Sequence, residues 1–216
     1  MTVRQIPRSR RSITGLFPSL KNGKMVPFES TLERDLCQLL EFDDAVIGYE
    51  AQPVIVEYRR PSGRRCQGVP DYLIFHEPTT GRPPELCDVK YRSDLFAHWP
   101  ELKSRLKAAR RHAIEQGWSY KIRTEVEIRT DRLRNAVFLY RFLSNGPPDP
   151  KHARILLECL RRLSGSSPAT LLAACHPGVE RALALPALWY LIASRRAAAD
   201  LDVPLTMDSQ ICDSDQ

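Results

Sequence analysis

Two carboxylates and one lysine lie at the ends of two apolar runs, at a spacing that suits phosphodiester chemistry. Asp71 precedes the run 72–75, and Asp88 and Lys90 lie at the end of a second run. Both runs have the composition of buried strands, and the prolines and glycine of 78–84 mark a turn between them. Side chains alternate along a strand, so Asp88 and Lys90 project from one face. If the strands pair as a hairpin, Asp71 approaches Asp88.

Ligand chemistry predicts what such a cluster would hold. Two adjacent carboxylates repel, and one keeps a proton unless a cation lies between them. Carboxylate oxygens suit Mg²⁺, which lowers the pKa of a bound water and stabilises charge on a phosphate under attack. Lys90 would orient that water or neutralise the developing charge. The D-x-K pattern is common, however, and a solvated salt bridge on an edge strand explains it equally well when it stands alone.

A helix predicted over residues 27–42 offers a third carboxylate. Leucines 32, 36, 39 and 40 recur at helical spacing and form one apolar stripe. Glu29 has an ordinary explanation, because an acid at a helix N-terminus is stabilised by the helix dipole. Glu33 lies beside the stripe and is the better candidate for the site.

The remaining elements indicate an α/β fold with a mixed central sheet flanked by helices. The predicted strands are 46–50, 54–58, a meander over 65–75, 85–90, and one or two strands over 118–129. The predicted helices after the first are 94–116 and 132–143.

The net charge of +6 is concentrated at the N-terminus, where no acid precedes Glu29. Residues 1–26 are predicted to form a basic arm, with Arg8, Arg10 and Arg11 as phosphate contacts, although a disordered basic tail that aids solubility would have the same composition. Cations also crowd the exposed faces of the 94–116 helix: Lys103, Arg105, Lys107, Arg110 and Arg111. A solvated helix face and a phosphate-binding face both explain them; Lys103, Lys107, Arg110 and Arg111 are the candidate DNA contacts.

A linker over 144–150 separates a second segment with a different composition. Three predicted helices and a strand in 150–201 match a winged helix-turn-helix, which would bind DNA or a protein partner. An acidic tail, 202–216, is predicted to be loose. The six cysteines have no zinc-ligand spacing and predict reduced core thiols. No signal peptide or membrane span is recognised, so we expect a cytoplasmic bacterial protein.

Several short motifs in order resemble the TnsA family of transposon end-cleaving endonucleases, a branch of the PD-(D/E)xK restriction-endonuclease-like fold. They are 28–34 (FESTLER), 40–43 (LEFD), 50–53 (EAQP), 70–73 (PDYL) and 88–90 (DVK). The resemblance covers roughly residues 20–145, and 150–201 resembles the family's C-terminal winged-helix domain. The predicted domains are therefore an endonuclease domain over 27–145 and a winged-helix-like domain over 150–201.

The resemblance implies the roles of individual residues. Glu33, Asp71, Asp88 and Lys90 would be catalytic. Glu33, Asp71, Asp88 and the Val89 carbonyl would bind Mg²⁺, for which Mn²⁺ would substitute. Some members carry Gln at the position of Asp88. Gln52 matches the E-x-Q-P stretch, and the sequence predicts no role for it.

By the same resemblance the chain would cleave the 5′ ends of a transposon. A TnsB-like DDE transposase would cut and join the 3′ ends, and a TnsC-like ATPase would engage the complex. Two alternatives stay open: a free-standing restriction or repair nuclease, and a catalytically idle nuclease fold that serves as a DNA or protein adaptor.

Overall fold

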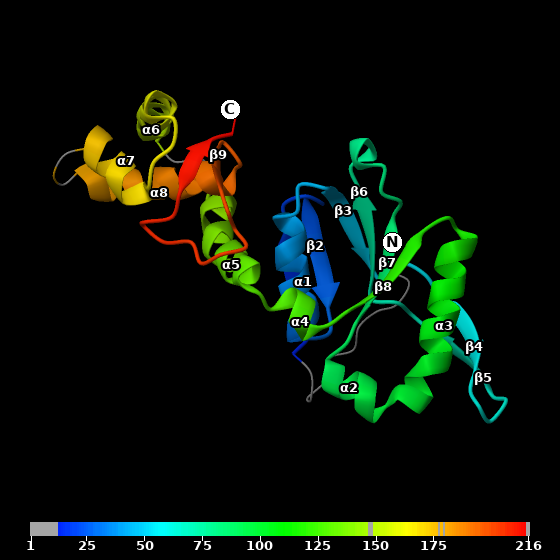
Figure 1. The fold of residues 1–216 in the computed structure, drawn as a ribbon. Coiled ribbons are helices and arrows are strands. Elements are labelled where there is room, and N and C mark those ends of the chain that lie inside the picture. Colours follow the sequence, from blue (N-terminus) through cyan, green and yellow to red (C-terminus); the bar gives the residue numbers. More distant parts are fainter. Residues whose placement is uncertain (1–12, 147–148, 177, 179, 215–216) are drawn as a thin grey trace. The chain divides into compact units, whose positions relative to one another are not determined.

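The computed structural model describes residues 13–146, 149–176, 178 and 180–214 (Figure 1). The chain divides into two compact units, a first that ends at Arg129 and a second that begins at Thr130. The predicted boundary at 145–150 is therefore about fifteen residues too late. The helix α5 (Asp131–Ser144) belongs to the second unit, because it packs against α8 (Glu180–Ala193).

A four-stranded mixed sheet forms the centre of the first unit, as the sequence predicted. Its strands are β3 (Val46–Ala51), β6 (Tyr72–His76), β7 (Glu85–Val89) and β8 (Ser119–Arg123), in the order β3-β6-β7-β8. The β6 and β7 strands form the expected antiparallel hairpin, joined through the 3₁₀ turn η1 (Pro78–Thr80). Gly81 closes that turn with φ of 64°, a left-handed conformation that glycine adopts without steric cost.

Strand β8 runs parallel to β7 because helices cross between them. The crossover contains α2 (Arg92–Ala97) and α3 (Trp99–Glu115), where the sequence predicted one helix. The break falls just before Pro100, which has no N–H to continue the α2 ladder and is tolerated in the first turn of α3.

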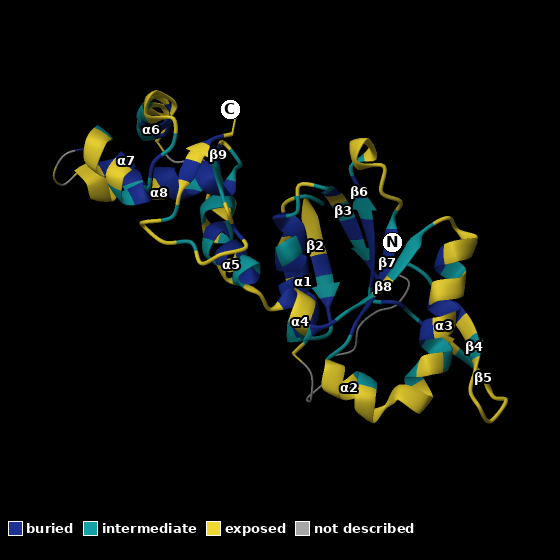
Figure 2. Ribbon diagram, viewed as in Figure 1, coloured by how far each residue is buried: buried dark blue, intermediate teal, exposed yellow. Residues whose placement is uncertain are grey.

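Helices cover both faces of the sheet. On one face the Cys37 thiol of α1 (Thr31–Glu41) donates to the Tyr72 hydroxyl. On the other face Leu73 packs with Ala108 and Ala109 of α3. Tyr72 and Leu73 are neighbours in β6, so they point to opposite faces. Figure 2 shows the buried centre of the sheet between the two helical layers. The short helix α4 (Glu125–Ile128) follows β8 and contacts α1.

The N-terminal segment contains regular structure that the predicted basic arm over 1–26 did not include. Within the described residues, β1 (Gly15–Ser19) and β2 (Lys24–Phe28) form an antiparallel hairpin. Phe17 and Val26 are buried, and the Glu41 carboxylate accepts hydrogen bonds from the Ser19 hydroxyl and two main-chain N–H groups. These buried residues and hydrogen bonds anchor the hairpin to α1. Residues 1–12 of the predicted arm lie outside the described part.

A second two-stranded hairpin, β4 (Val56–Arg59) with β5 (Arg65–Gly68), leaves the central sheet and lies against α3. It replaces the continuous meander that the sequence predicted over 65–75. Pro70 interrupts that meander, and the chain re-enters the central sheet at β6.

The second unit contains α5, α6 (Pro150–Leu163), α7 (Pro168–Cys175) and α8, followed by β9 (Ala197–Ala199) and β10 (Ile211–Asp213). The predicted loose tail is wrong in part, because β10 pairs with β9 and completes the two-stranded wing. Ile211 is fully buried and Asp213 pairs with Arg161 of α6. The unit is mostly helical, as predicted.

The cysteine prediction is wrong for one pair. Cys159 of α6 and Cys175 of α7 form a disulfide, whereas Cys37, Cys66, Cys87 and Cys212 are free. The described helices include none with the length and apolar character that crossing a membrane requires.

Candidate active site

Asp71 lies at the point where the chain enters β6, beside the end of β7. Its carboxylate Oδ2 accepts a hydrogen bond of 2.6 Å from the Val89 main-chain N–H. The same oxygen lies 2.9 Å from Lys90 Nζ. The antiparallel pairing of β6 and β7 places these groups together, because Tyr72 lies opposite Cys87 in the register. The hairpin thus brings Asp71 to the end of the D-V-K strand, where it contacts Val89 and Lys90, whereas the sequence predicted its approach to Asp88.

Lys90 contacts two oxygens at once. Its ammonium lies 2.9 Å from Asp71 Oδ2 and 2.7 Å from its neighbour's main-chain oxygen, Val89 O. Burial by itself would lower the pKa of Lys90, but the carboxylates of Asp71 and Asp88 outweigh it and raise that pKa. Lys90 is therefore an ammonium ion in this structure and donates to both oxygens.

Glu33 reaches the same region from the first turn of α1. Burial, followed by the negative charge of Asp71, raises the pKa of Glu33 to about 7, and Lys90 opposes this shift. Glu33, Val89 and Lys90 line one cleft of about 450 Å³, together with Ile13, Ser30, Thr31, Leu32, Tyr91 and Asp94. The fold thus brings Glu33 close to Asp71 and Lys90, which are far from it in sequence.

Glu33 also caps its own helix. Its carboxylate accepts from the Glu29 main-chain N–H at 2.8 Å and from the Ser30 hydroxyl at 3.0 Å, and Ser30 in turn accepts from the Glu33 N–H. This is a reciprocal cap of the S-x-x-E type, and the sequence 30–33 carries its signature. One carboxylate therefore both orders the start of α1 and faces the cleft.

Asp88 is fully buried, and its partners differ from those of Glu33, Asp71 and Lys90. Its Oδ1 lies 2.7 Å from Arg105 Nη2 of α3, and its Oδ2 accepts a 2.7 Å hydrogen bond from the Tyr120 hydroxyl of β8. Burial and the charge of Asp71 raise the pKa of Asp88, and Arg105 opposes the shift. Both carboxylate oxygens are engaged by protein groups, so the predicted role of Asp88 as a metal ligand stays a prediction.

Arg105 and Tyr120 are site residues that the sequence did not predict. Arg105 was grouped with the exposed cations of its helix, yet its side chain is only 16% exposed. A signal was present: Arg105 precedes the buried Ala109 and Ala113 by four and eight residues, which places it on the buried stripe. Gly68 makes room for it, because a Cβ there would lie 2.7 Å from Arg105 Cγ.

Gln52 supports the site through Glu29. Its side-chain Nε2 donates to Glu29 Oε1 at 2.9 Å, and its main-chain N–H donates to Asp71 O at 2.8 Å. Gln52 adopts φ of 52°, which is uncommon for a residue other than glycine, and its Oε1 is buried without a partner. Gln52 thus positions Glu29, whose main-chain N–H donates to the Glu33 carboxylate. It also fixes the backbone at Asp71, where the chain enters β6.

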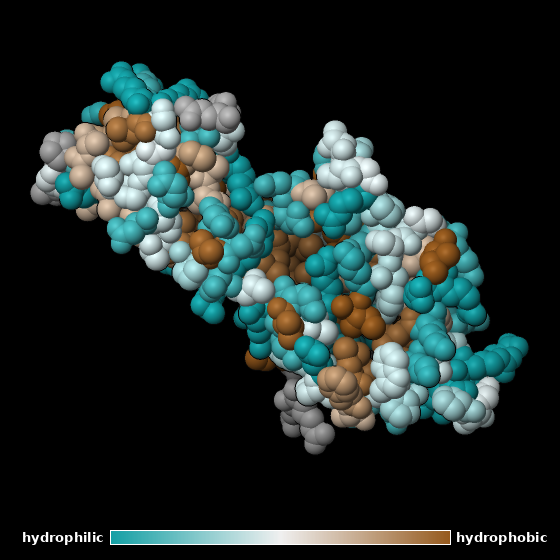
Figure 3. Space-filling view, viewed as in Figure 1, coloured by the Kyte–Doolittle hydropathy of each residue, from teal (hydrophilic) through white to brown (hydrophobic). Residues whose placement is uncertain are grey.

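The predicted DNA contacts fall into two groups. Arg8, Arg10 and Arg11 lie outside the described residues. Exposed side chains are confirmed for all four candidates on α3: Lys103, Lys107, Arg110 and Arg111. Figure 3 shows mostly hydrophilic residues over α3 and the β4–β5 hairpin on the face in view.

Family comparison agrees with this division of the chain. Residues 43–125 match the TnsA-like endonuclease N-terminal domain, and residues 127–201 match the TnsA endonuclease C-terminal domain. Together the two matches cover well over half of the chain, and they meet within a few residues of the boundary between the two structural units. The chain belongs to the TnsA endonuclease family. No individual curated protein matches it.

TnsA-family membership implies a metal, and the oxygens of this site fit one in kind. Asp71 Oδ2 and Val89 O already hold one cation, the Lys90 ammonium. Carboxylate and carbonyl oxygens are the ligands that Mg²⁺ and Mn²⁺ prefer. Burial is the main cause of the raised pKa of Glu33, and the negative charge of Asp71 adds to it. Among the described residues, no three His, Cys, Asp or Glu side chains lie together as a ready-made ligand group.

The raised pKa of Glu33 makes the stability of this TnsA-family chain depend on pH. The folded chain binds the proton more tightly than the unfolded chain, so this contribution is complete below about pH 4.5 and is lost as pH rises through about 7. In metal-free buffer we expect wild type to lose on the order of 2–3 kcal/mol relative to Glu33→Gln over that interval. Urea unfolding at a series of pH values measures this.

The control for that measurement is Glu101→Gln, which changes an exposed acid in the first turn of α3. Its difference from wild type should stay constant with pH. A constant difference for Glu33→Gln as well would show that Glu33 does not hold the additional proton.

Proposed function

We propose that this chain is a metal-dependent DNA endonuclease that cleaves the 5′ ends of a transposon during cut-and-paste transposition. The observation that carries the proposal is the cleft at Glu33, Val89 and Lys90, with Asp71 bound to the last two, in a chain of the TnsA family. Mg²⁺ is the proposed cofactor, and Mn²⁺ is expected to substitute for it.

The proposed roles follow from the chemistry of each group. Asp71, Glu33 and Val89 O would hold the divalent cation, with Asp88 as a further ligand if Arg105 releases it. The cation would supply Lewis-acid stabilisation of the phosphate and activation of the attacking water. Lys90 stays protonated and would donate to a phosphate oxygen as negative charge develops there.

The ammonium must leave its present position for that role. Lys90 now neutralises Asp71 directly. A divalent cation on Asp71 and Val89 O would repel the ammonium, and Lys90 would then turn toward the substrate. The same side chain therefore stabilises the metal-free site and takes part in catalysis in the loaded one.

The proposed partners divide the work of excision. A TnsB-like DDE transposase would cut and join the 3′ ends, and a TnsC-like ATPase would regulate the complex. Sequence specificity would lie mainly with the transposase, because exposed Lys and Arg side chains on α3 suit phosphate contacts better than base edges.

A nicking assay on transposon-end DNA tests the function, with and without the partner transposase. We expect 5′-end nicks in Mg²⁺ or Mn²⁺, and no nicks once EDTA removes the metal. Cleavage of a defined site by the isolated chain would favour a free-standing restriction or repair nuclease instead. Absence of cleavage in the complete mixture, together with absence of Mn²⁺ binding by the isolated chain, would favour an idle adaptor.

A further inference from the structure

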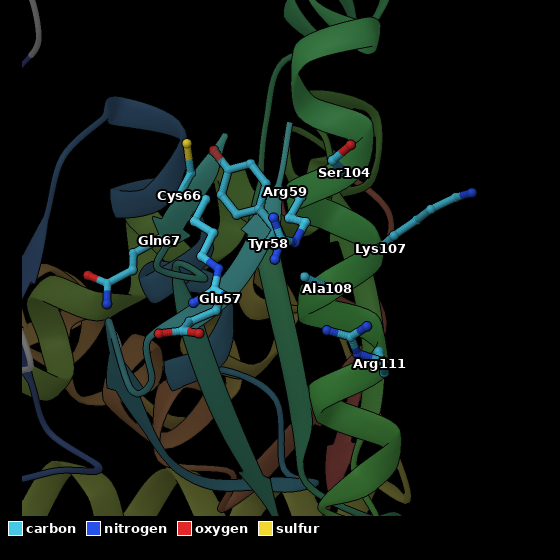
Figure 4. Close-up of a pocket in the computed structure, with 10 residues that line it drawn as sticks. Glu57, Tyr58, Arg59, Cys66, Gln67, Ser104, Lys107, Ala108 and Arg111 are labelled. Carbon is cyan, nitrogen blue, oxygen red and sulfur yellow. The ribbon is translucent and has the colours of Figure 1, made fainter. Parts of the chain in front are cut away.

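The β4–β5 hairpin and α3 enclose a groove that the proposed active site does not use. Its volume is about 950 Å³. The hairpin contributes Glu57, Tyr58, Arg59, Arg65, Cys66 and Gln67, and the helix contributes Ser104, Lys107, Ala108 and Arg111. Figure 4 shows these side chains on the two walls, with Lys107 extending away from α3.

The groove is basic on both walls. Residues 56–68 contain one acid, Glu57, and four arginines: Arg59, Arg60, Arg64 and Arg65. Arg111 pairs at 3.7 Å with Glu115, an exposed acid on its own helix. Within the described part of the chain, Arg65 and Lys107 form no ion pair with a carboxylate. Cations without acidic partners on both walls favour a polyanionic ligand.

Both walls of the groove are connected to the candidate active site by residues that are close in sequence. On the hairpin wall, Gln67 is followed by Gly68, the last residue of β5, and Asp71 is three residues further on. On the helix wall, Ser104 precedes Arg105, which binds both Asp88 and the Val69 main-chain oxygen. Arg105 therefore ties the helix wall to the segment that leads from the hairpin to Asp71.

We propose that this groove binds the phosphate backbone of the DNA that flanks the cleaved bond. The identification of the polyanion as DNA rests on the proposed function. Tyr58, Gln67 and Ser104 add an aromatic ring and neutral hydrogen-bonding groups between the cations, which suits a sugar-phosphate strand. The arginine-rich hairpin is thereby a DNA-contacting element, together with the helix cations predicted from the sequence.

The test measures DNA binding by the full chain in EDTA, so that no cleavage occurs. The groove variant is Arg65→Gln with Lys107→Gln, one change on each wall. The control is Lys24→Gln with Arg82→Gln, which removes the same charge from exposed positions on β2 and beyond η1. Fluorescence anisotropy gives the affinity for a transposon-end duplex and an unrelated duplex over a series of salt concentrations.

For the groove variant we expect a plot of log affinity against log salt that is shallower by about 2, from two lost phosphate contacts. The affinity at low salt should fall roughly tenfold or more for both duplexes, and the control should keep the wild-type slope. Equal losses in both variants would reduce the effect to net charge and overturn the proposal. So would a wild-type slope in the groove variant.

The two proposals fail in different ways. If the chain cuts no DNA with any metal or partner but its DNA binding depends on the groove, the nuclease proposal is wrong and the groove proposal holds. If the chain cuts DNA but the groove variant binds DNA like wild type, the groove proposal is wrong and the nuclease proposal holds.

Discussion

Replacing Lys90 with Ala is expected to reduce nicking of transposon-end DNA by about 10²–10³-fold, the usual cost of removing one preorganised donor from a developing negative charge. The ammonium lies 2.9 Å from Asp71 and its pKa is raised, so the side chain is charged and lies beside the proposed cation site, from which it would turn toward the phosphate. Single-turnover cleavage with saturating DNA and Mg²⁺ measures the loss. Asp71 keeps its hydrogen bond from the Val89 N–H, so the fold should persist.

Two further variants make the Lys90 result specific. Lys121→Ala removes a half-exposed lysine from the neighbouring strand β8, where Arg123 still neutralises Glu85, and it should cleave like wild type. Lys90→Arg should stay impaired, because a planar guanidinium does not reproduce a compact ammonium in a small site. Cleavage by Lys90→Ala at the wild-type rate would place the chemistry elsewhere in the chain.

Replacing Arg105 with Ala is expected to destabilise the first unit by about 3–5 kcal/mol, since it leaves the fully buried Asp88 carboxylate without its cation. Tyr120 alone would then hold that charge, and part of the loss would be recovered by protonating Asp88. Hydrogen exchange of the β7 and β8 amides measures the effect in this unit by itself.

The comparison for Arg105 is a pair of matched changes. Arg111→Ala removes an arginine from the same helix whose ion pair with Glu115 is exposed, and it should cost under about 1 kcal/mol. Adding Asp88→Asn to Arg105→Ala should restore much of the stability, because the charge that lacked a partner is gone. If these amides are protected from exchange in Arg105→Ala as well as they are in Arg111→Ala, the buried Asp88 carboxylate does not need Arg105 as its partner.

The buried position of Asp88 limits what an inactive Asp88 variant would show. Removing this carboxylate also removes the partner of Arg105, so an inactive Asp88 variant by itself does not identify a metal ligand. Lys90 is a cleaner test, because it lines the cleft and its removal leaves Asp71 the hydrogen bond from the Val89 N–H.

Much of the first unit could be predicted from local patterns. The runs 72–75 and 85–89 have no alternative to buried strands, and a turn rich in proline and glycine joins them. Pairing of these two strands as a hairpin then placed Asp71 near the D-V-K strand end. The early hairpin, β1 with β2, was missed because its buried residues Phe17 and Val26 are few and lie among basic residues. The strand β10 was missed because three residues give no measurable period.

The sequence by itself determined which groups are available: an acid after a proline at the start of one strand, a lysine at the end of the next, and an acid in a capped helix. Those are local properties, set by neighbours within a few residues. Only the tertiary structure decided that Glu33 lies near Asp71, that Asp88 turns to Arg105 and Tyr120, and that the β4–β5 hairpin lies against α3. The physical reason is that a buried charge takes whichever partner long-range packing places within reach, and that packing depends on residues far apart in the chain.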